Sequence, residues 1–288
     1  MSEEKVTCNV CHAHCALSEG QTGRCMARWN NGGKIKAKNY GVITSLALDP
    51  IEKKPLARFF PGTRILSVGS YGCNLQCPFC QNYEISRSDG EAIHIQSETM
   101  SPEELCSLAA ELKNNGRGNI GVAFTYNEPL VGWEFVRDTA KLVHAAGMKN
   151  VLVSNGNASQ EILAEILPYI DAMNIDLKSF DGNCYKDYLK GDLDMVKAFI
   201  STASRAEHCD LEITSLIVPG HNDSPEEMRD LSSWIAALDD GRGIEIPLHI
   251  TRYFPRYRES APATDIALIH RLAAIAKENL HHVYIGNC

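Results

Sequence analysis

The sequence predicts an α/β protein with a mainly parallel sheet, arranged as a partial (β/α)6-type barrel and preceded by a small cysteine-rich segment. From about Arg64 onward, short apolar runs alternate with amphipathic stretches of helical length, which is typical of βαβ units. Seven of the eleven cysteines lie before residue 81. A chain of 288 residues is long enough for one large domain and an appendage. We therefore expect a metal-binding segment over residues 1–60 and the barrel over residues 61–288.

The barrel elements are expected from strand-like runs and helix-start signals. Ser101 and Ser224 are each followed by proline and two glutamates, which predicts a capped helix start at both places. Further helices are expected over Val131–Ala146 and Asp265–Leu280. Strands are expected near Ile65–Val68, Ile120–Phe124, Val151–Ser154, Ala172–Asp176, Leu211–Val218, Ile244–Ile250 and His282–Ile285.

Four cysteines at the amino-terminal end, Cys8, Cys11, Cys15 and Cys25, fall within 18 residues of sequence. Glycines surround them, and the segment has too little apolar residue content for a core of its own. A bound metal would supply the missing stabilisation. This pattern predicts a second metal site, holding either zinc or an iron–sulfur cluster. The alternative is a set of free thiols packed against the barrel.

Composition narrows the class of protein further. The net charge of −8, with no basic run, argues against a nucleic-acid or anionic-membrane surface. The acidic start Met1–Lys5 lacks an apolar stretch, and no run of 18 apolar residues occurs, so we expect no signal peptide and no membrane span. Eleven cysteines without a secretion signal indicate metal binding in a reducing cytoplasm.

The most informative motif is Cys73-x3-Cys77-x2-Cys80, which directly follows the first expected barrel strand. Three thiolates can hold three corners of a [4Fe-4S] cube, which normally takes four cysteines. The fourth iron is then open to substrate or cofactor. A zinc knuckle is the alternative, although zinc prefers four ligands and paired C-x2-C knuckles. The loop's place at a strand's carboxyl end is where α/β enzymes carry their active sites.

Polar residues follow the later strands at the same edge of the expected sheet. An acidic side chain beside exposed carbonyls suits an ammonium group, which favours a cofactor role for the turn containing Glu128. The alternatives are structural: a helix-entry turn at Pro129, a generic Asn-Gly turn, a solvated ion pair, and a core histidine. The candidate cofactor-binding residues are Tyr126, Asn127, Glu128, Ser154, Asn155, Asp176, Lys178, Thr214, His249 and Arg252.

The cysteine spacing, with the aromatic Phe79 before the last cysteine, resembles the signature of the radical S-adenosylmethionine (SAM) superfamily. More specifically, the chain resembles the AmmeMemoRadiSam system radical SAM enzyme family, which is related to the pyruvate formate-lyase activating enzymes. The likeness covers nearly the whole chain. It rests on the block Asp49-Pro50-Ile51-Glu52-Lys53-Lys54-Pro55-Leu56, on Phe60-Pro61-Gly62, on Gln81-Asn82 after the cysteine loop, and on Pro247–Tyr257.

The resemblance implies roles for several candidate residues. The turn before Pro129 resembles the Gly-Gly-Glu-Pro element, with Tyr126 and Asn127 in place of the glycines. Ser154 and Asn155 match a ribose-contacting Thr-Asn-Gly element, and the pair Asp176 and Lys178 matches an Asp-x-Lys element of the activating enzymes. Thr214 stands where those enzymes have an arginine that helps to bind the SAM carboxylate, a departure that argues against an identical function.

The resemblance also implies the chemistry. A [4Fe-4S] cluster on Cys73, Cys77 and Cys80 would bind SAM at its open iron and cleave it to a 5'-deoxyadenosyl radical, which abstracts hydrogen from an unidentified substrate. The electron would come from a low-potential flavodoxin or ferredoxin, and the family name implies Memo-like and AMMECR-like partner proteins. One alternative is an enzyme that activates a glycyl-radical enzyme; a more remote one is an iron–sulfur electron carrier.

Overall fold

A computed structural model describes residues 4–87 and 97–288. Its main feature is an eight-stranded sheet with strand order β14-β13-β12-β11-β10-β9-β7-β6. Every neighbouring pair is parallel except β6 and β7, which are antiparallel. The strands are β6 (Ser45–Pro50), β7 (Arg64–Gly69), β9 (Asn119–Phe124), β10 (Lys149–Ser154), β11 (Ala172–Asp176), β12 (Asp210–Ile217), β13 (Leu248–Arg252) and β14 (Val283–Gly286).

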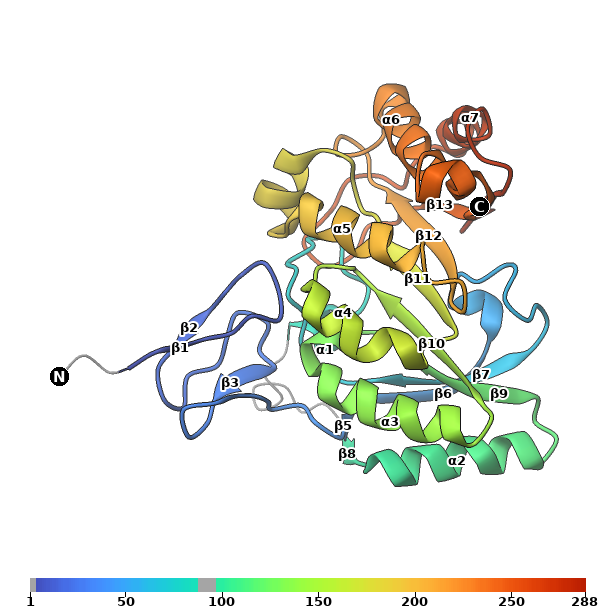
Figure 1. Ribbon diagram of the computed structural model, residues 1–288. Coiled ribbons are helices and arrows are strands. Elements are labelled where there is room, and N and C mark those ends of the chain that lie inside the picture. Colours follow the sequence, from blue (N-terminus) through green and yellow to red (C-terminus); the bar gives the residue numbers. More distant parts are fainter. Residues whose placement is uncertain (1–3, 88–96) are drawn as a thin grey trace.

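A helix separates each parallel strand from the next, which gives six β/α units and a final strand. In Figure 1 the helices lie along one face of the curved sheet. Among the described residues, β6 and β14 do not pair with each other, so the sheet stays open. The expected α/β fold with a mostly parallel sheet is confirmed. The helices are α2 (Pro102–Asn114), α3 (Trp133–Ala145), α4 (Gln160–Ile166), α5 (Leu193–Ala203), α6 (Pro225–Ala236) and α7 (Ile266–Ala276).

The two predicted helix starts have the expected caps. The Ser101 side chain accepts a hydrogen bond from the Glu104 amide, and Glu104 returns one to the Ser101 amide. Ser224 accepts from the Glu227 amide in the same way. These bonds satisfy amides that the first helical turn leaves without partners. Buried, mainly aliphatic side chains of the strands and helices form the core between the sheet and its helices, as expected for parallel strands covered by helices.

One strand prediction was wrong in its bounds, and one strand was missed. The strand expected at Ile244–Ile250 begins only at Leu248 and runs to Arg252; the preceding residues belong to a 3-10 turn, Asp239–Glu245, and Pro247 lacks the N–H that a ladder requires. Strand β6 was not predicted. It lies within residues 1–60 but joins the barrel sheet through its pairing with β7, a tertiary contact that local propensity does not report.

Short elements make up the rest of the described chain. In Figure 1 the amino-terminal segment forms a lobe beside the sheet; its first three residues lie outside the described residues. No helix in the described parts of the chain is long and apolar enough to cross a membrane. The short elements are β1 (Val6–Thr7), β2 (Ala16–Leu17), β3 (Arg28–Asn30), β4 (Ile35–Ala37), β5 (Val42–Ile43), β8 (Glu98–Thr99), α1 (Tyr83–Ser86) and the 3-10 or π turns η1 (Ile51–Lys53), η2 (Pro129–Gly132), η3 (Leu167–Tyr169), η4 (Cys184–Leu189) and η5 (Asp239–Glu245).

The segment after β6 closes the amino-terminal end of the barrel. Ile51, Leu56 and Phe59 are buried and pack against small or branched residues of β7, β9, β10 and β11. Glu212, near the start of β12, accepts hydrogen bonds from the amides of Ala57 and Arg58, both at 2.9 Å. Residues 54–57 therefore form the floor of the cavity that opens at the other end of the strands.

Candidate functional site

The loop after β7 carries the three cysteines of the C-x3-C-x2-C motif. Cys73, Cys77 and Cys80 are half-buried and line one cavity of about 700 Å³. The loop begins at the carboxyl end of β7, as the sequence predicts. The Cys73 sulfur accepts a hydrogen bond from the Leu75 amide at 3.4 Å, a contact that stabilises negative charge on sulfur. The three thiols thus face a space large enough for a cofactor.

The spacing of these thiols suits a cluster better than a single ion. Thiolates around one zinc ion lie about 4 Å apart. Within residues 4–87 and 97–288, no three Cys, His, Asp or Glu side chains lie close enough to hold one metal ion. A cube spreads its ligands over separate irons, and no further cysteine lines this cavity among the described residues. The donor set therefore fits a [4Fe-4S] cluster with one iron left for another ligand.

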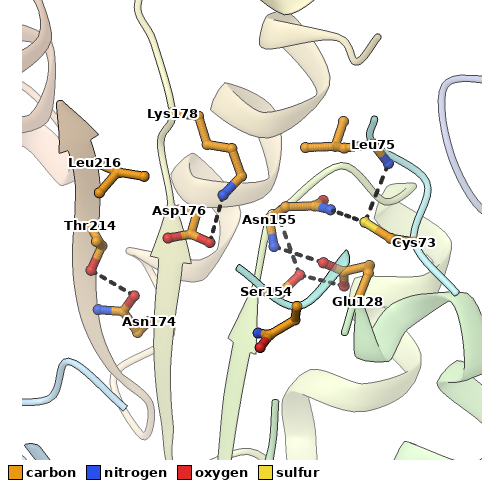
Figure 2. Close-up of polar contacts among 12 residues, drawn as sticks. Cys73, Leu75, Glu128, Ser154, Asn155, Asn174, Asp176, Lys178, Thr214 and Leu216 are labelled. Atoms are coloured by element: carbon orange, nitrogen blue, oxygen red, sulfur yellow. Dashed lines mark hydrogen bonds and ion pairs between the residues drawn. The ribbon is translucent and has the colours of Figure 1, made fainter. Parts of the chain in front are cut away.

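Glu128 lies beside the cysteine loop, at the start of the turn after β9. Its carboxylate accepts hydrogen bonds from the Ser154 hydroxyl and from the amides of Asn155 and Leu130, at 2.8, 2.8 and 3.0 Å. Figure 2 shows the first two of these contacts, which join the ends of β9 and β10. Burial raises the pKa of Glu128 to about 7, although these hydrogen bonds oppose the shift. The site therefore holds a carboxylate that a bound cation would stabilise.

Asn155 connects this carboxylate to the cysteine loop. Its side-chain amide lies 3.7 Å from the Cys73 sulfur (Figure 2). The same amide donates to the Asn74 side chain at 2.9 Å. Asn74 in turn donates to the carbonyl of Asn157 at 2.7 Å. These contacts hold the loop after β10 against the loop after β7. A cofactor bound to the cysteine loop would therefore lie close to the polar groups of the loop after β10.

Tyr126, which the resemblance aligns with a motif glycine, has a φ of 72°, a left-handed conformation that is costly for a bulky residue. The side chain offsets this cost. Its hydroxyl donates to Asp49 at 2.7 Å, and the Lys54 ammonium lies 4.7 Å from its ring centroid. Gly69 leaves room for the ring, because a Cβ there would lie 2.8 Å from it. The Asp49–Leu56 block therefore supports the turn that carries Glu128.

Lys54 and Asp49 form a buried ion pair at 2.9 Å, with side-chain exposures of 3% and 11%. We expect Lys54→Met to destabilise the protein by about 3 kcal/mol, because it leaves a buried carboxylate without its partner. Lys53→Met is the matched control: Lys53 also contacts Asp49, at 3.3 Å, but its side chain is 67% exposed, so its loss should cost less than about 1 kcal/mol. Chemical denaturation of both variants measures the difference.

The same pair has a predictable pH dependence. Burial disfavours ionisation of Asp49, but hydrogen bonds from Tyr126 and Lys54 outweigh it and hold the pKa of Asp49 well below its usual value of 3.8. A depressed carboxyl pKa contributes stability above the unfolded-state pKa, and this contribution is lost as the pH falls below it. The stability difference between wild type and Lys54→Met should therefore shrink below pH 3.8. A difference that persists unchanged in acid would contradict this assignment.

Asp176 and Lys178, at the end of β11, form an ion pair at 2.9 Å (Figure 2). Both line the cavity, so the pair does not belong to the outer surface of the barrel. Burial raises the pKa of the Cys77 thiol to about 12, and the charge of Lys178 opposes that shift. At this end of the cavity, the Lys178 ammonium therefore lies near the Cys77 thiol, and the Asp176 carboxylate lies beside it.

The far wall comes from β12 and β13. The Thr214 hydroxyl donates to the Asn174 side chain at 2.9 Å (Figure 2). His249 pairs through Nε2 with Glu212 at 2.5 Å, and its ring stacks on Tyr284 with centroids 5.2 Å apart. Thr214 and His249 line the cavity. Neither Asn174 nor Glu212 was predicted; a charged residue two positions before Thr214, on the same face of an apolar strand, was the available signal.

Arg252 lies apart from the other candidates. Its Nε donates to the carbonyl of Thr264 at 2.7 Å, and its guanidinium packs on Phe254. It is not among the described residues that line the cavity. A cofactor role for any single candidate stays a prediction. The candidates that the structure brings to the cavity are Tyr126, Asn127, Glu128, Ser154, Asn155, Asp176, Lys178, Thr214 and His249.

Comparison with protein families decides the class of enzyme. Residues 67–235 match the radical SAM superfamily, and the matched region contains the cysteine loop and most of the cavity wall. This chain belongs to the radical SAM superfamily. Membership implies a [4Fe-4S] cluster and SAM, and the three thiols on the cavity wall fit that cluster.

Two relatives extend this result. An uncharacterised protein of Methanocaldococcus jannaschii is 38% identical over 291 residues, which cover 100% of this chain and 83% of that protein. The 4-hydroxyphenylacetate decarboxylase activating enzyme of Clostridioides difficile is 25% identical over 161 residues. That match spans 55% of this chain and 51% of the relative, so it connects the chain with radical SAM activating enzymes without fixing a substrate.

Solved structures agree on the fold. A domain of a pyruvate-formate lyase-activating enzyme from Bacteroides vulgatus aligns with a TM-score of 0.50 at 20% identity, covering 58% of this chain and 99% of that domain. Streptococcus suis SuiB bound to S-adenosylmethionine aligns with a TM-score of 0.55 at 14% identity, covering 76% of this chain and 48% of SuiB. At these identities the likeness concerns the fold alone.

Proposed function

We propose that this radical SAM enzyme binds its [4Fe-4S] cluster through Cys73, Cys77 and Cys80 and binds SAM in the adjoining cavity. The observation that carries the proposal is that one cavity is lined both by the three thiols and by polar side chains from the ends of successive strands. A reduced cluster of this kind supplies the electron that cleaves SAM to methionine and a 5'-deoxyadenosyl radical, which then abstracts hydrogen from a substrate.

The chain's own residues would bind and orient SAM. The buried Glu128 carboxylate suits the ammonium group of the methionine moiety, and Ser154 and Asn155 offer hydrogen-bonding groups for the ribose. The opposite charges of Asp176 and Lys178 lie near the cluster thiols and would contact the remaining polar groups. Thr214 takes the place of the arginine of the activating enzymes, so a neutral hydroxyl faces the cavity there.

Two substrate classes are open to this site. We favour a small molecule or peptide that enters the cavity above its closed floor. Activation of a glycyl-radical enzyme is the second candidate, because the chain is similar to the C. difficile activating enzyme. The resemblance of the Asp49–Leu56 block extends the proposal to the AmmeMemoRadiSam family, with Memo-like and AMMECR-like proteins as partners. A low-potential flavodoxin or ferredoxin would supply electrons in the cytoplasm. We also propose that the amino-terminal cysteines hold a second metal centre, zinc or iron–sulfur.

The proposal is tested by anaerobic incubation of the reconstituted protein with SAM and dithionite. We expect 5'-deoxyadenosine and methionine in equal amounts, and faster formation when a correct substrate is added. A glycyl-radical signal on an added partner enzyme would favour the activating role. Deuterium transfer from a labelled small molecule into 5'-deoxyadenosine would favour the first class. Loaded protein that forms no 5'-deoxyadenosine under any of these conditions would contradict the proposal.

A further inference from the structure

The four amino-terminal cysteines line one small chamber in the lobe beside the barrel. Cys8, Cys11 and Cys25 are buried and Cys15 is half-buried. The β1–β2 pairing brings the first and third together, with the Cys8 amide donating to the Cys15 carbonyl at 2.9 Å. Thiols spread along the sequence therefore line one chamber, although no three of them lie close enough, within the described residues, to hold a single metal ion.

Two guanidinium groups add positive charge to the chamber wall, which Arg24 and Arg28 line. Arg28 makes two hydrogen bonds to Glu134, at 2.8 and 2.5 Å. The Nε atoms of Arg24 and Arg28 are both buried without a partner among the described residues. A buried donor without a partner is costly, and four thiolates around zinc or around a [4Fe-4S] cluster carry the net negative charge that would offset it.

The chamber adjoins the loop that carries the predicted cluster ligands. The Cys73 amide donates to the Cys25 carbonyl at 3.1 Å. Gly72 has a φ of 90°, and a Cβ there would lie 2.6 Å from that carbonyl. Asn74 also lines the chamber, while its side chain reaches the loop after β10. The segment Gly72–Asn74 therefore lies between the amino-terminal chamber and the predicted radical SAM cluster site.

We propose that Cys8, Cys11, Cys15 and Cys25 hold a second metal–thiolate centre, and that this centre fixes the loop that presents Cys73 to the radical SAM cluster. The spacing of these thiols favours an iron–sulfur cluster, which spreads its ligands over separate irons, over a single zinc ion. The inference rests on the proposed function only for the identity of the neighbouring cluster. The role of the amino-terminal lobe would then be to hold the cluster ligand Cys73 in place.

The metal content of a variant without the radical SAM ligands tests the first part. Cys73→Ala, Cys77→Ala and Cys80→Ala together remove the neighbouring cluster and leave the four amino-terminal cysteines unchanged. After anaerobic loading with iron and sulfide, we expect this triple variant to retain about four irons per chain. Adding the four amino-terminal Cys→Ala changes should remove that metal. Adding Cys106→Ala and Cys288→Ala, which lie outside both cysteine sets, should not.

A triple variant that retains no iron after this loading would overturn the second centre. This outcome needs no folded sevenfold variant, because the absence of metal from the triple variant is decisive. It is also separate from SAM cleavage, so it can fail while the proposed function holds.

The coupling is tested by replacing only the amino-terminal cysteines. Loss of groups that orient a metal ligand typically costs 10- to 100-fold in metal affinity, so iron at the radical SAM site should exchange to a chelator roughly tenfold faster than in wild type. Asn74→Ala, which keeps all seven thiols, should give the same direction of change. Unchanged iron retention in both variants would refute the coupling.

Discussion

Replacing Cys73, Cys77 and Cys80 together with alanine should reduce 5'-deoxyadenosine formation to the level of the enzyme-free reaction. No other thiols line the cavity among the described residues, and a cluster held by fewer cysteines is not expected to persist. Anaerobic assays with SAM and dithionite, followed by chromatography, measure the loss. The paramagnetic signal of the reduced radical SAM cluster should disappear with it.

The matched control removes an equal number of thiols elsewhere. Cys106, Cys184 and Cys209 lie outside the cavity lining and outside the amino-terminal chamber. Replacing them with alanine should leave 5'-deoxyadenosine formation within about twofold of wild type in protein that remains folded. Equal activity in the two triple variants would show that the reaction does not depend on the C-x3-C-x2-C loop.

Glu128→Gln should weaken SAM binding by roughly 10- to 100-fold, because a charge-assisted hydrogen bond to an ammonium group contributes about 1.5–3 kcal/mol. Glutamine keeps the size of the side chain and removes its charge. Anaerobic calorimetry or equilibrium dialysis of cluster-loaded protein gives the dissociation constant. Glu226→Gln, at an exposed position in the first turn of α6, is the control and should bind SAM like wild type. An affinity that Glu128→Gln does not change would remove Glu128 from the SAM site.

The pKa of Glu128 gives this prediction a second readout. Burial raises the pKa from 4.5 to about 7, so the folded protein keeps a proton there that the unfolded chain has lost. Its contribution to stability is present below pH 4.5 and lost as the pH rises towards 7. SAM binding has the opposite dependence, because the ionised carboxylate binds the ammonium group. Affinity should therefore rise between pH 6 and pH 8 in wild type and stay flatter in Glu128→Gln.

The sequence is most informative where function depends on local spacing. Cys73, Cys77 and Cys80 lie within eight residues of sequence, and a strand precedes them directly. The polar groups at the strand ends were predictable for a related reason: parallel strands bring their carboxyl ends to one edge. The motif and the alternation of strands and helices were therefore enough to predict that the three cysteines and nine of the ten polar candidates lie on one cavity wall.

Contacts between distant segments were not predictable. Tyr126 reaches Asp49 across 77 residues of sequence, and His249 pairs with Glu212 across 37. The Asp49–Leu56 block was the most specific feature of the resemblance, yet its task as barrel floor and support for Tyr126 became visible only in three dimensions. The edge strand β6 was not predicted for the same reason, because its pairing with β7 depends on tertiary packing.

A continuous set of contacts connects the cavity floor with the polar groups at the strand ends. The Asp49–Leu56 block holds Tyr126 in a strained turn, the turn positions Glu128, and Glu128 joins the ends of β9 and β10. Asn155 extends this network to Cys73. Substitutions in the floor should therefore affect SAM binding as well as stability, although the floor is at the opposite end of the strands from the cysteine loop.

The most direct measurement is a crystal structure of the anaerobically reconstituted protein with SAM. We expect a cluster on Cys73, Cys77 and Cys80 and SAM in the cavity beside it, with hydrogen bonds to at least two of four residues at the strand ends. SAM density at the amino-terminal end of the strands, or a cluster held by other cysteines, would contradict the account. The four residues are Glu128, Asn155, Asp176 and Lys178.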